Sequence, residues 1–329
     1  MTGEFYRNKR ALVTGGLGFI GSNLALRLVE LGADVTLVDS MLPAYGATLA
    51  NIEPIRDRVH VNFSDVRDPH SMRHLIRERD LIFSLAGQVS HSESMRDPMT
   101  DLEINCRSQL TLLECCRHGN PGAKIVFAST RQLYGRPQYL PVDEDHPVVP
   151  VDVNGINKLA AEKYYSLYHD VHGLDTVSLR LTNTYGPRME LANDSKGFVG
   201  VFIRKALLGE TIRIYGTGQQ RRDFNYVSDV VDALLVAGRS ESVNGRVFNL
   251  GHPDATSLSG FVEILRGLAD FDFEFVPFPP EAEAIDIGDY FGDFRRFREA
   301  TGWEPHMGLR DGLAKTLEYY RACGWTPTG

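Results

Sequence analysis

Short apolar runs alternate with amphipathic stretches along the first 186 residues of the chain. The runs are rich in Val and Ile and do not alternate strictly with polar residues, which is typical of strands covered on both faces of a parallel sheet. They cover residues 11–15, 34–40, 59–66, 80–87, 123–130 and 175–186. Helices are expected between them at about 19–31, 69–79, 97–118 and 153–172. This order predicts an α/β fold with a Rossmann-like, doubly wound parallel sheet.

A different pattern begins after Gly186, where Gly and Pro become frequent and the apolar runs shorten. One further helix and strand, at about 228–250, could return to the main sheet. We therefore predict a main lobe made of 1–186 plus 228–251 and a smaller, discontinuous α/β lobe made of 187–227 plus 252–329.

Composition narrows the class of protein. The chain has 329 residues, 43% of them hydrophobic and 24% charged, which suits about two lobes with a substantial core. Its formal charge of −8 argues against a broad face for nucleic acid or membrane. The polar N-terminus leads directly into a strand and no apolar run approaches the ~20 residues of a membrane span, so neither a signal peptide nor a membrane anchor is expected. The four cysteines lack metal-ligand spacing, which favours a protein without a metal site in the reducing cytoplasm.

A glycine-rich turn, residues 14–21, follows the first strand and opens the first helix. Gly15, Gly18 and Gly21 would let the backbone turn sharply, approach a pyrophosphate and pack the helix against the strand, and Phe19 and Ile20 lie at the helix N-terminus that would face the phosphates. The alternative is a glycine turn that holds no ligand. The position of the motif between a strand and a helix favours dinucleotide binding.

Polar and small residues at the ends of the next strands extend this prediction. Asp39, at the end of the second strand, is placed to bind the ribose hydroxyls of an adenosine, and its charge would repel a 2′-phosphate, so NAD is favoured over NADP. Asp65 and Val66 end the third strand, where they would meet the adenine, although Asp65 could be only a turn or capping residue. Leu85, Ala86 and Gly87 end the fourth strand, where small residues let a dinucleotide lie close to the backbone.

Taken in order, these motifs resemble those of the extended short-chain dehydrogenases/reductases, specifically the NDP-sugar epimerase/dehydratase family. The resemblance runs nearly end to end and includes GGLGFIG, LAGQVS, FASTRQLYG, NKLAAEKYY, RLTNTYGPR, YGTGQQRRDFNYVSDVVDA and GWEP. It implies that the main lobe binds NAD, that the smaller lobe binds a nucleotide-diphosphate sugar, and that the protein is a homodimer joined through the helices at about 97–118 and 153–172.

The resemblance also implies a catalytic set, from which this chain departs at one position. In the family a Ser or Thr hydroxyl, a Tyr and a Lys four residues later handle proton transfer while NAD takes and returns a hydride. The matching positions are Thr130, Asn154 and Lys158, so an amide stands where the family has its tyrosine. An amide cannot act as a base near neutral pH, although it can donate and accept hydrogen bonds.

Three explanations of this departure stay open. Asn154 could hold a water or the sugar while Thr130 or another ionisable group, such as His91 in the loop after the fourth strand, transfers the proton. The reaction could need only weak base assistance. Catalysis could also be lost, leaving a protein that only binds NAD and a sugar nucleotide. The persistence of the lysine, the hydroxyl and the phosphate-binding elements favours the first two.

Further matched positions narrow the reaction and the substrate. Family 4,6-dehydratases have an Asp-Glu pair after the catalytic Thr, and the decarboxylases keep the Glu, whereas this chain has Arg131 and Gln132. What remains is oxidation and re-reduction at one carbon, most simply epimerisation at C4, with C2, C3 or C5, or an unusual sugar such as a heptose, as alternatives. By the resemblance, Asn105 belongs to the hydrogen-bond network around the cofactor. The predicted contacts to the substrate are made by His91, Thr130, Asn183, Arg188 and Arg222.

Overall fold

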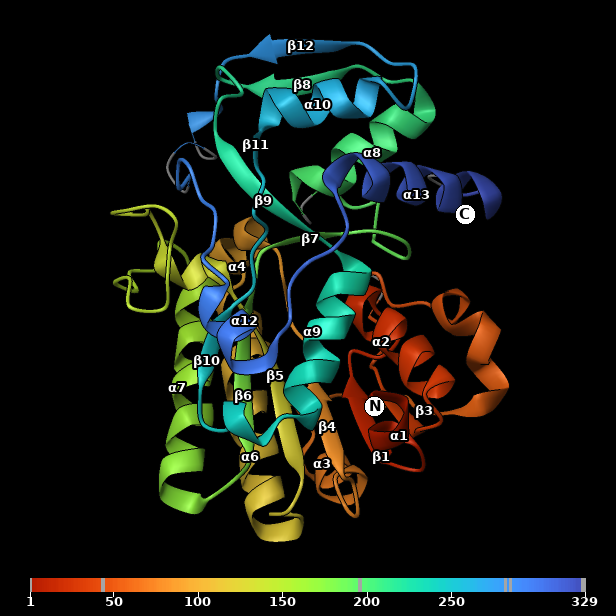
Figure 1. Ribbon diagram of the computed structural model, residues 1–329, viewed down its shortest axis with the longest axis vertical. Helices are drawn as coiled ribbons and strands as arrows, with labels where there is room; N and C mark the ends of the chain where they lie inside the picture. The colour runs from red at the N-terminus through yellow and green to blue at the C-terminus, as the bar shows by residue number, and fades with distance from the viewer. Residues whose placement is uncertain (1, 43–44, 195–196, 281–282, 284–285, 327–329) are drawn as a thin grey trace.

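The computed structural model describes residues 2–42, 45–194, 197–280, 283 and 286–326, and its largest feature is a seven-stranded sheet (Figure 1). All seven strands pair in parallel. Their order across the sheet is β10 (Val247–Asn249), β6 (Thr176–Leu181), β5 (Lys124–Thr130), β4 (Leu81–Ser84), β1 (Arg10–Thr14), β2 (Asp34–Val38) and β3 (Val59–Asn62). The order changes direction between β1 and β4, as in a doubly wound sheet, so the predicted fold class is confirmed.

Helices cover both faces of this sheet because neighbouring residues of a strand point to opposite sides. Val13 and Phe83 belong to one apolar core together with residues of α2 (Phe19–Glu30) and α9 (Val227–Arg239). The residues Leu12 and Ile82 belong to the other core. That second core is completed by α3 (Pro69–Leu75), α6 (Ser108–Gly119) and α7 (Val153–His172). The strands are therefore buried on both faces, which is why their sequences read as nearly continuous apolar runs.

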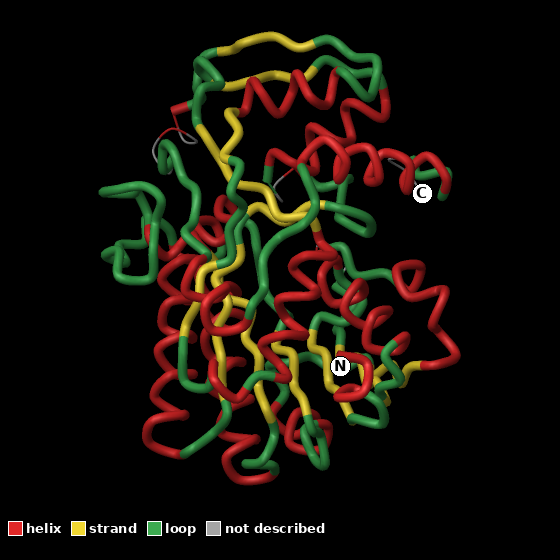
Figure 2. The backbone as a smooth tube through the Cα atoms, in the orientation of Figure 1, coloured by secondary structure: helices red, strands yellow, loops and turns green. Residues whose placement is uncertain are grey.

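The remaining sheets lie beyond the carboxyl edge of the main sheet (Figures 1 and 2). A three-stranded sheet contains β11 (Ala255–Ser257), β9 (Arg221–Tyr226) and β7 (Asn183–Tyr185), and a two-stranded one contains β12 (Phe273–Val276) and β8 (Ile212–Tyr215). Around them an aromatic-rich core is shared with α8 (Phe198–Leu208), α10 (Leu258–Arg266) and α13 (Leu309–Ala322).

Short helices complete the described part of the chain. They are α1 (Thr2–Tyr6), η2 (Leu49–Arg58), α4 (His91–Arg96), α5 (Pro98–Leu102), η4 (Arg131–Tyr134), η6 (Glu241–Val243) and α12 (Arg295–Thr301). Phe297 of α12 and Trp303 pack into the core of the main sheet although they follow the smaller sheets in sequence. The exact boundaries of the two predicted lobes stay a prediction. Among the described residues, no helix is both long and apolar enough to cross a membrane.

Two predicted elements are divided in the structure. The apolar run 175–186 forms β6 in the main sheet and β7 in the three-stranded sheet, with Thr182 between them. The hydroxyl of Thr182 donates a hydrogen bond to Asp223 of β9, which draws the chain toward the second sheet. The predicted helix 97–118 contains a π-helical turn, η3 (Glu103–Arg107), between α5 and α6. Such turns are rare and are frequently found at functional sites.

Candidate functional site

The glycine turn packs its own backbone closely. Gly15 has a φ of +69°, and a Cβ there would lie 3.0 Å from the backbone of Ala86. At Gly21 a Cβ would overlap the carbonyl oxygen of Gly15, whereas at Gly18 it would lie 3.3 Å from the same oxygen. The helix α2 begins after Gly18 without a side-chain cap, so Phe19 and Ile20 lie in its first turn, where backbone N–H groups attract anions. At positions 15 and 21 only glycine allows the backbone segments to approach this closely.

Asp39 lies directly after β2 and faces the same turn. Its two carboxylate oxygens accept hydrogen bonds from the backbone N–H groups of Leu17, at 3.1 Å, and Met41, at 2.9 Å. Burial raises the pKa of Asp39 above its ordinary value, and these two hydrogen bonds oppose that rise. The carboxylate is therefore fixed beside the turn, as a group that binds ribose hydroxyls must be.

Asp65 and Val66 follow β3. Asp65 accepts a hydrogen bond from the backbone N–H of Arg67 at 2.8 Å and pairs with the Arg67 guanidinium at 2.6 Å. That pairing lowers the pKa of Asp65. The turn role foreseen as the alternative for Asp65 is therefore present, and a contact with adenine by Asp65 or Val66 stays a prediction.

The end of β4 brings the cofactor and catalytic positions together. The backbone N–H groups of Leu85 and Ala86 both donate to the hydroxyl of Thr14, at 3.1 Å each, which holds this segment against β1. A Cβ on Gly87 would lie 3.0 Å from both Nζ of Lys158 and Oδ1 of Asn105. Two polar side chains from different helices therefore meet at one glycine.

Lys158 is buried at this meeting point. Its Nζ donates a hydrogen bond to the carbonyl oxygen of Ala128, 3.1 Å away, and lies 5.0 Å from the centre of the Phe127 ring. Burial lowers the pKa of Lys158 to about 8, while the negative charge of Asp101 raises it in opposition. The Oδ1 atom of Asn105 is buried and has no hydrogen-bond partner among the described residues, and a buried acceptor without a partner is unusual.

Asn154 belongs to a buried network that centres on Asp101, a residue that the sequence analysis missed. Nδ2 of Asn154 donates to the carbonyl oxygen of Gln88 at 2.8 Å and to Oδ2 of Asp101 at 3.1 Å. Asp101 also accepts from Asn105 at 3.0 Å and from Asn157 at 2.8 Å. The spacing of four residues between Asp101 and Asn105 places both on one helix face, so this part of the network could have been foreseen.

Thr130 and His91 are connected to each other through a second buried carboxylate. Thr130 ends β5, and its hydroxyl accepts a hydrogen bond from the backbone N–H of Gln132 at 3.2 Å. The side chain of Gln132 donates to Oδ2 of Asp152 at 3.0 Å. The same oxygen lies 2.9 Å from Nδ1 of His91. His91 was expected in a loop, but it is the first residue of α4, which begins after Ser90. Asp152 was also missed, although its place just before a helix is typical of a capping residue.

The predicted phosphate-binding residues fall into two groups. Asn183, at the start of β7, accepts a hydrogen bond from Arg131 at 3.2 Å, and Arg222 of β9 is close enough to Arg131 that the two guanidinium groups repel. Burial, followed by that repulsion, lowers the pKa of Arg222 to about 10. Arg188 instead donates to the carbonyl oxygen of Asn51 at 2.9 Å. Within the described part of the chain, no hydrogen bond or ion pair joins Arg188 to Asn183 or Arg222.

These observations fit a dinucleotide. The glycine turn and the start of α2 would hold its pyrophosphate, Asp39 its adenosine ribose, and Lys158 with Asn105 its nicotinamide end.

Comparison with known proteins agrees with a dinucleotide as the ligand. Residues 11–251 match the model of the NAD dependent epimerase/dehydratase family. The chain is 33% identical over 317 residues to a UDP-glucose 4-epimerase of Mycolicibacterium smegmatis, covering 95% of this chain and 98% of that protein. It is 35% identical over 322 residues to UDP-glucuronic acid decarboxylase 1 of Xenopus tropicalis, covering 95% of this chain and 72% of that protein.

A solved structure extends the comparison to the fold. The UDP-glucose 4-epimerase of Thermotoga maritima, solved with UDP-glucose, is similar to this structure with a TM-score of 0.87 and 30% sequence identity, covering 96% of this chain and all of that one. The resemblance drawn from the sequence and the expected cofactor are both confirmed. The chain belongs to the NAD-dependent epimerase/dehydratase family.

Proposed function

We propose that this protein is an epimerase that inverts C4 of a nucleotide-diphosphate sugar. One observation carries the proposal: Lys158, Asn105 and Gly87 meet at the carboxyl end of β4, on the predicted path of the nicotinamide, and Thr130 ends the neighbouring strand. A sugar hydroxyl near Thr130 would be oxidised to a ketone and re-reduced on its other face. NAD supplies the acceptor and the donor of the hydride.

Gln132 supports epimerisation over elimination or decarboxylation. It occupies the position at which the related dehydratases and decarboxylases have an acidic residue. Its amide cannot transfer a proton, and its Nε2 is engaged with Asp152 at 3.0 Å. Without an acid there, a ketone at C4 has no described group at this position to assist loss of water across C5 and C6.

The phosphate end of the site suits the demands of epimerisation. Asn183 and Arg222 would hold the diphosphate, and Arg131 lies beside both. Binding energy from the nucleotide can then retain the oxidised sugar while its ring turns to present the other face. The UDP-sugar names of the relatives support a nucleotide sugar as substrate. Their division between epimerases and decarboxylases leaves the reaction to be tested.

The roles of the chain's own side chains follow from their contacts. Lys158, held by the carbonyl of Ala128, would bind a ribose hydroxyl and supply positive charge near the reacting carbon. Asn154 would orient the sugar or a water, because its Nδ2 is fixed by Gln88 and Asp101 and no described residue donates to its Oδ1. Thr130 would bind the hydroxyl that reacts.

We also propose a homodimer through α5 and α7. These helices expose apolar side chains, among them Met99 (64% exposed), Ile156 (53%) and Leu167 (49%). Exposed apolar residues grouped on neighbouring helices are typical of an interface. Combining Ile156→Glu with Leu167→Glu should give a monomer in sedimentation velocity, whereas Phe275→Glu, at a residue 54% exposed on β12, should not.

The test of the function is a product analysis. Purified protein would be incubated with NAD and a panel of nucleotide-diphosphate sugars in deuterated water, and the products read by NMR. A new C4 epimer without deuterium at C4 supports internal return of the hydride. Deuterium at C5 would point to a C3 or C5 path, and binding without turnover would point to a protein that only senses its ligands.

A further inference from the structure

The missing tyrosine leaves the proposed reaction without an evident proton acceptor, and the nearby groups differ in their ability to replace it. Asn154 is an amide and Thr130 an alcohol, so neither is a base near neutral pH. Asp101 is fully buried, and both of its oxygens accept hydrogen bonds from asparagine side chains. Lys158 is engaged with the carbonyl oxygen of Ala128. None of these four groups presents a free basic atom.

His91 differs from them in exposure and in its partner. Its side chain is 36% exposed, while the side chain of Asp152, to which it is joined, is fully buried. Nδ1 of His91 is buried and forms no hydrogen bond of ordinary geometry with a described residue, but it lies 2.9 Å from Oδ2 of Asp152, within ion-pair distance, so a small rotation of the ring would align the two atoms. Of the two neutral tautomers of the ring, a carboxylate at this distance favours the one that carries its proton on Nδ1 and leaves the lone pair of Nε2 free.

Asp152 is well suited to remain ionised. Its Oδ1 accepts the backbone N–H of Gly155 at 2.7 Å, and its Oδ2 accepts Nε2 of Gln132 at 3.0 Å. Burial alone would raise the pKa of Asp152, but the close contact with His91 and its charge, with these other donors, bring that pKa below its ordinary value. The carboxylate is therefore a fixed negative group at the start of α7.

The pair also lies beside the residues that the reaction is proposed to use. Gln132, which shares Oδ2 of Asp152 with His91, is bonded through its backbone N–H to the hydroxyl of Thr130. Ser94, on the same short helix as His91, accepts a hydrogen bond from the backbone N–H of Asn154 at 3.3 Å. Helix α4 is thus linked to Thr130 through His91 and to Asn154 through Ser94.

We propose that His91, oriented by Asp152, is the proton acceptor and donor of this enzyme, an inference that rests on the function proposed above. In the oxidation step the O–H bond of the sugar hydroxyl breaks and its proton passes to Nε2 of His91. The C–H bond at the same carbon breaks, and its hydrogen leaves with both electrons as the hydride that NAD accepts. In the return step the hydride comes back to the carbon and the imidazolium returns its proton to the oxygen. His91 is the catalytic residue and Asp152 a positioning residue.

The first experiment replaces His91 by Ala in the full chain. The sugar that the wild type converts is supplied with NAD, and kcat and KM are measured. We expect kcat to fall roughly 10²- to 10⁴-fold with KM little changed, the size typical of a lost general base. Added imidazole should restore part of kcat, since the ring site is open to solvent.

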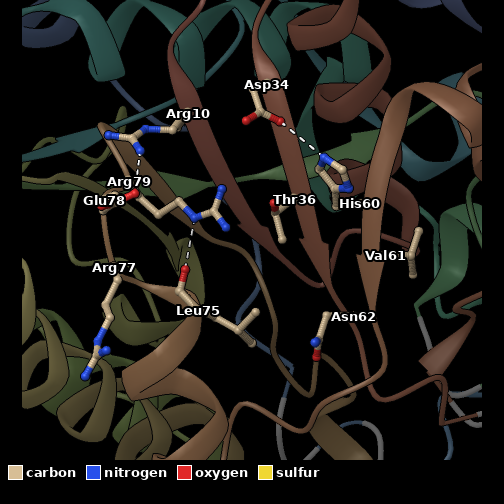
Figure 3. A pocket seen from close by; sticks show the side chains of 10 residues that line it. All are labelled: Arg10, Asp34, Thr36, His60, Val61, Asn62, Leu75, Arg77, Glu78 and Arg79. Atoms are coloured by element: carbon tan, nitrogen blue, oxygen red, sulfur yellow. Dashed lines mark hydrogen bonds and ion pairs between the residues drawn. The ribbon is translucent and has the colours of Figure 1, made fainter.

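A second histidine offers a matched control. His60 of β3 lies 3.7 Å from Asp34, at the amino edge of the sheet, and its side chain is 79% exposed (Figure 3). His60→Ala therefore removes a histidine that also pairs with an aspartate but lies at the opposite end of the strands. It should leave kcat and KM unchanged.

The second variant, Asp152→Asn, tests the orientation of the ring without removing the helix cap. Asparagine caps helices as well as aspartate does, so the contact with the N–H of Gly155 can persist. Its amide would donate to Nδ1 of His91 and move the ring proton to Nε2. Nitrogen-15 NMR of the histidine rings, with His91 assigned from the His91→Ala spectrum, should show protonated Nδ1 in the neutral wild type and protonated Nε2 in Asp152→Asn, which should also lose kcat.

The outcomes separate the two proposals. A wild-type enzyme that turns over while His91→Ala keeps its full kcat overturns the role of His91 and leaves the function standing. A neutral wild-type ring protonated on Nε2 overturns the orientation by Asp152. If the wild type itself converts no sugar in the panel, the proposed function fails, and the role of His91 fails with it.

Discussion

Nδ2 of Asn154 lies 3.1 Å from Oδ2 of Asp101, and both side chains are buried. The residue that replaces the family's tyrosine is therefore bound to a carboxylate that comes from a different helix. Asp101 accepts from three asparagine side chains in all, at positions 105, 154 and 157. Asn154 is thus held through its Nδ2 in a buried hydrogen-bond network, in which Oδ1 of Asn105 is left without a partner among the described residues.

Asn154→Asp should destabilise the protein in a pH-dependent way. It would place a second carboxylate against Asp101, and we expect a loss of about 3 kcal/mol in unfolding free energy at pH 8, as for an uncompensated buried charge. One of the two carboxyl groups would then hold a proton with a pKa above that of the unfolded chain, so the loss should shrink as the pH falls to 5.

Urea unfolding at the two pH values measures this effect. Asn154→Ala, which removes the donor without adding charge, is the control and should lose a similar amount of stability at both. Equal losses for Asn154→Asp at pH 5 and pH 8 would contradict the repulsion.

Lys158 should make the stability of the protein rise with pH. Burial lowers its pKa from 10.5 to about 8 in the folded protein. Between these values the unfolded chain binds more protons at this residue than the folded chain does, so the free energy of unfolding increases with pH through that window. The slope is at most about 1.4 kcal/mol per pH unit from this group.

Lys158→Met removes this contribution. The difference in unfolding free energy between the wild type and the variant, measured without NAD, should therefore change in favour of the wild type by about 2–3 kcal/mol from pH 8 to pH 10. Parallel curves for the two proteins over that range would show that the lysine titrates normally in the folded state.

The glycines of the turn should differ in their tolerance of a methyl group. A Cβ at position 21 overlaps the carbonyl oxygen of Gly15, whereas one at position 18 lies 3.3 Å from that oxygen. We expect Gly21→Ala to weaken NAD binding at least about 10-fold and to lower stability by about 1–3 kcal/mol, since overpacking displaces the backbone. Gly18→Ala should do much less. Fluorescence titration with NADH measures the affinities, and similar losses for both variants would contradict the geometry.

Arg222 should contribute to binding of the nucleotide more than to the chemical step. Arg222→Ala should weaken UDP binding by about 1.5–3 kcal/mol, the range for hydrogen bonds to charged groups. Calorimetric titration of UDP gives the affinity. Arg213→Ala is the control, because Arg213 is an exposed arginine paired with Glu274 on β12. A full affinity in Arg222→Ala would show that the diphosphate is held elsewhere.

The sequence predicts the main sheet well because its strands are buried on both faces and read as apolar runs. The strand positions, the glycine turn and the site of Asp39 all follow from local patterns of this kind. The π-helical turn and the division of the run 175–186 do not, since no local feature distinguishes them from a continuous helix or strand. The division at Thr182 depends on a distant residue, Asp223, which accepts the hydrogen bond of the Thr182 hydroxyl.

The same distinction applies to the candidate site. Thr130, Asn154 and Lys158 could be located from motifs, and Asp152 could have been recognised as a helix cap. That His91 meets Asp152, 61 positions further along, and that Asn154 meets Asp101, 53 positions before it, depends on how helices from separate parts of the chain are packed. The chemical role of a residue can therefore be predicted from the local sequence, but the residue that it contacts in the folded protein cannot.

The passage of the chain from β6 to β7 limits how this fold could admit a different ligand. Because Thr182 alone separates β6 of the main sheet from β7, which carries Asn183, the two sheets are joined by a single residue. A longer or shorter sugar nucleotide would then be difficult to admit by moving the whole three-stranded sheet that contains β7. Substrate selectivity would be altered more readily by exchanging side chains such as Arg131 and Gln132 while the backbone stays unchanged.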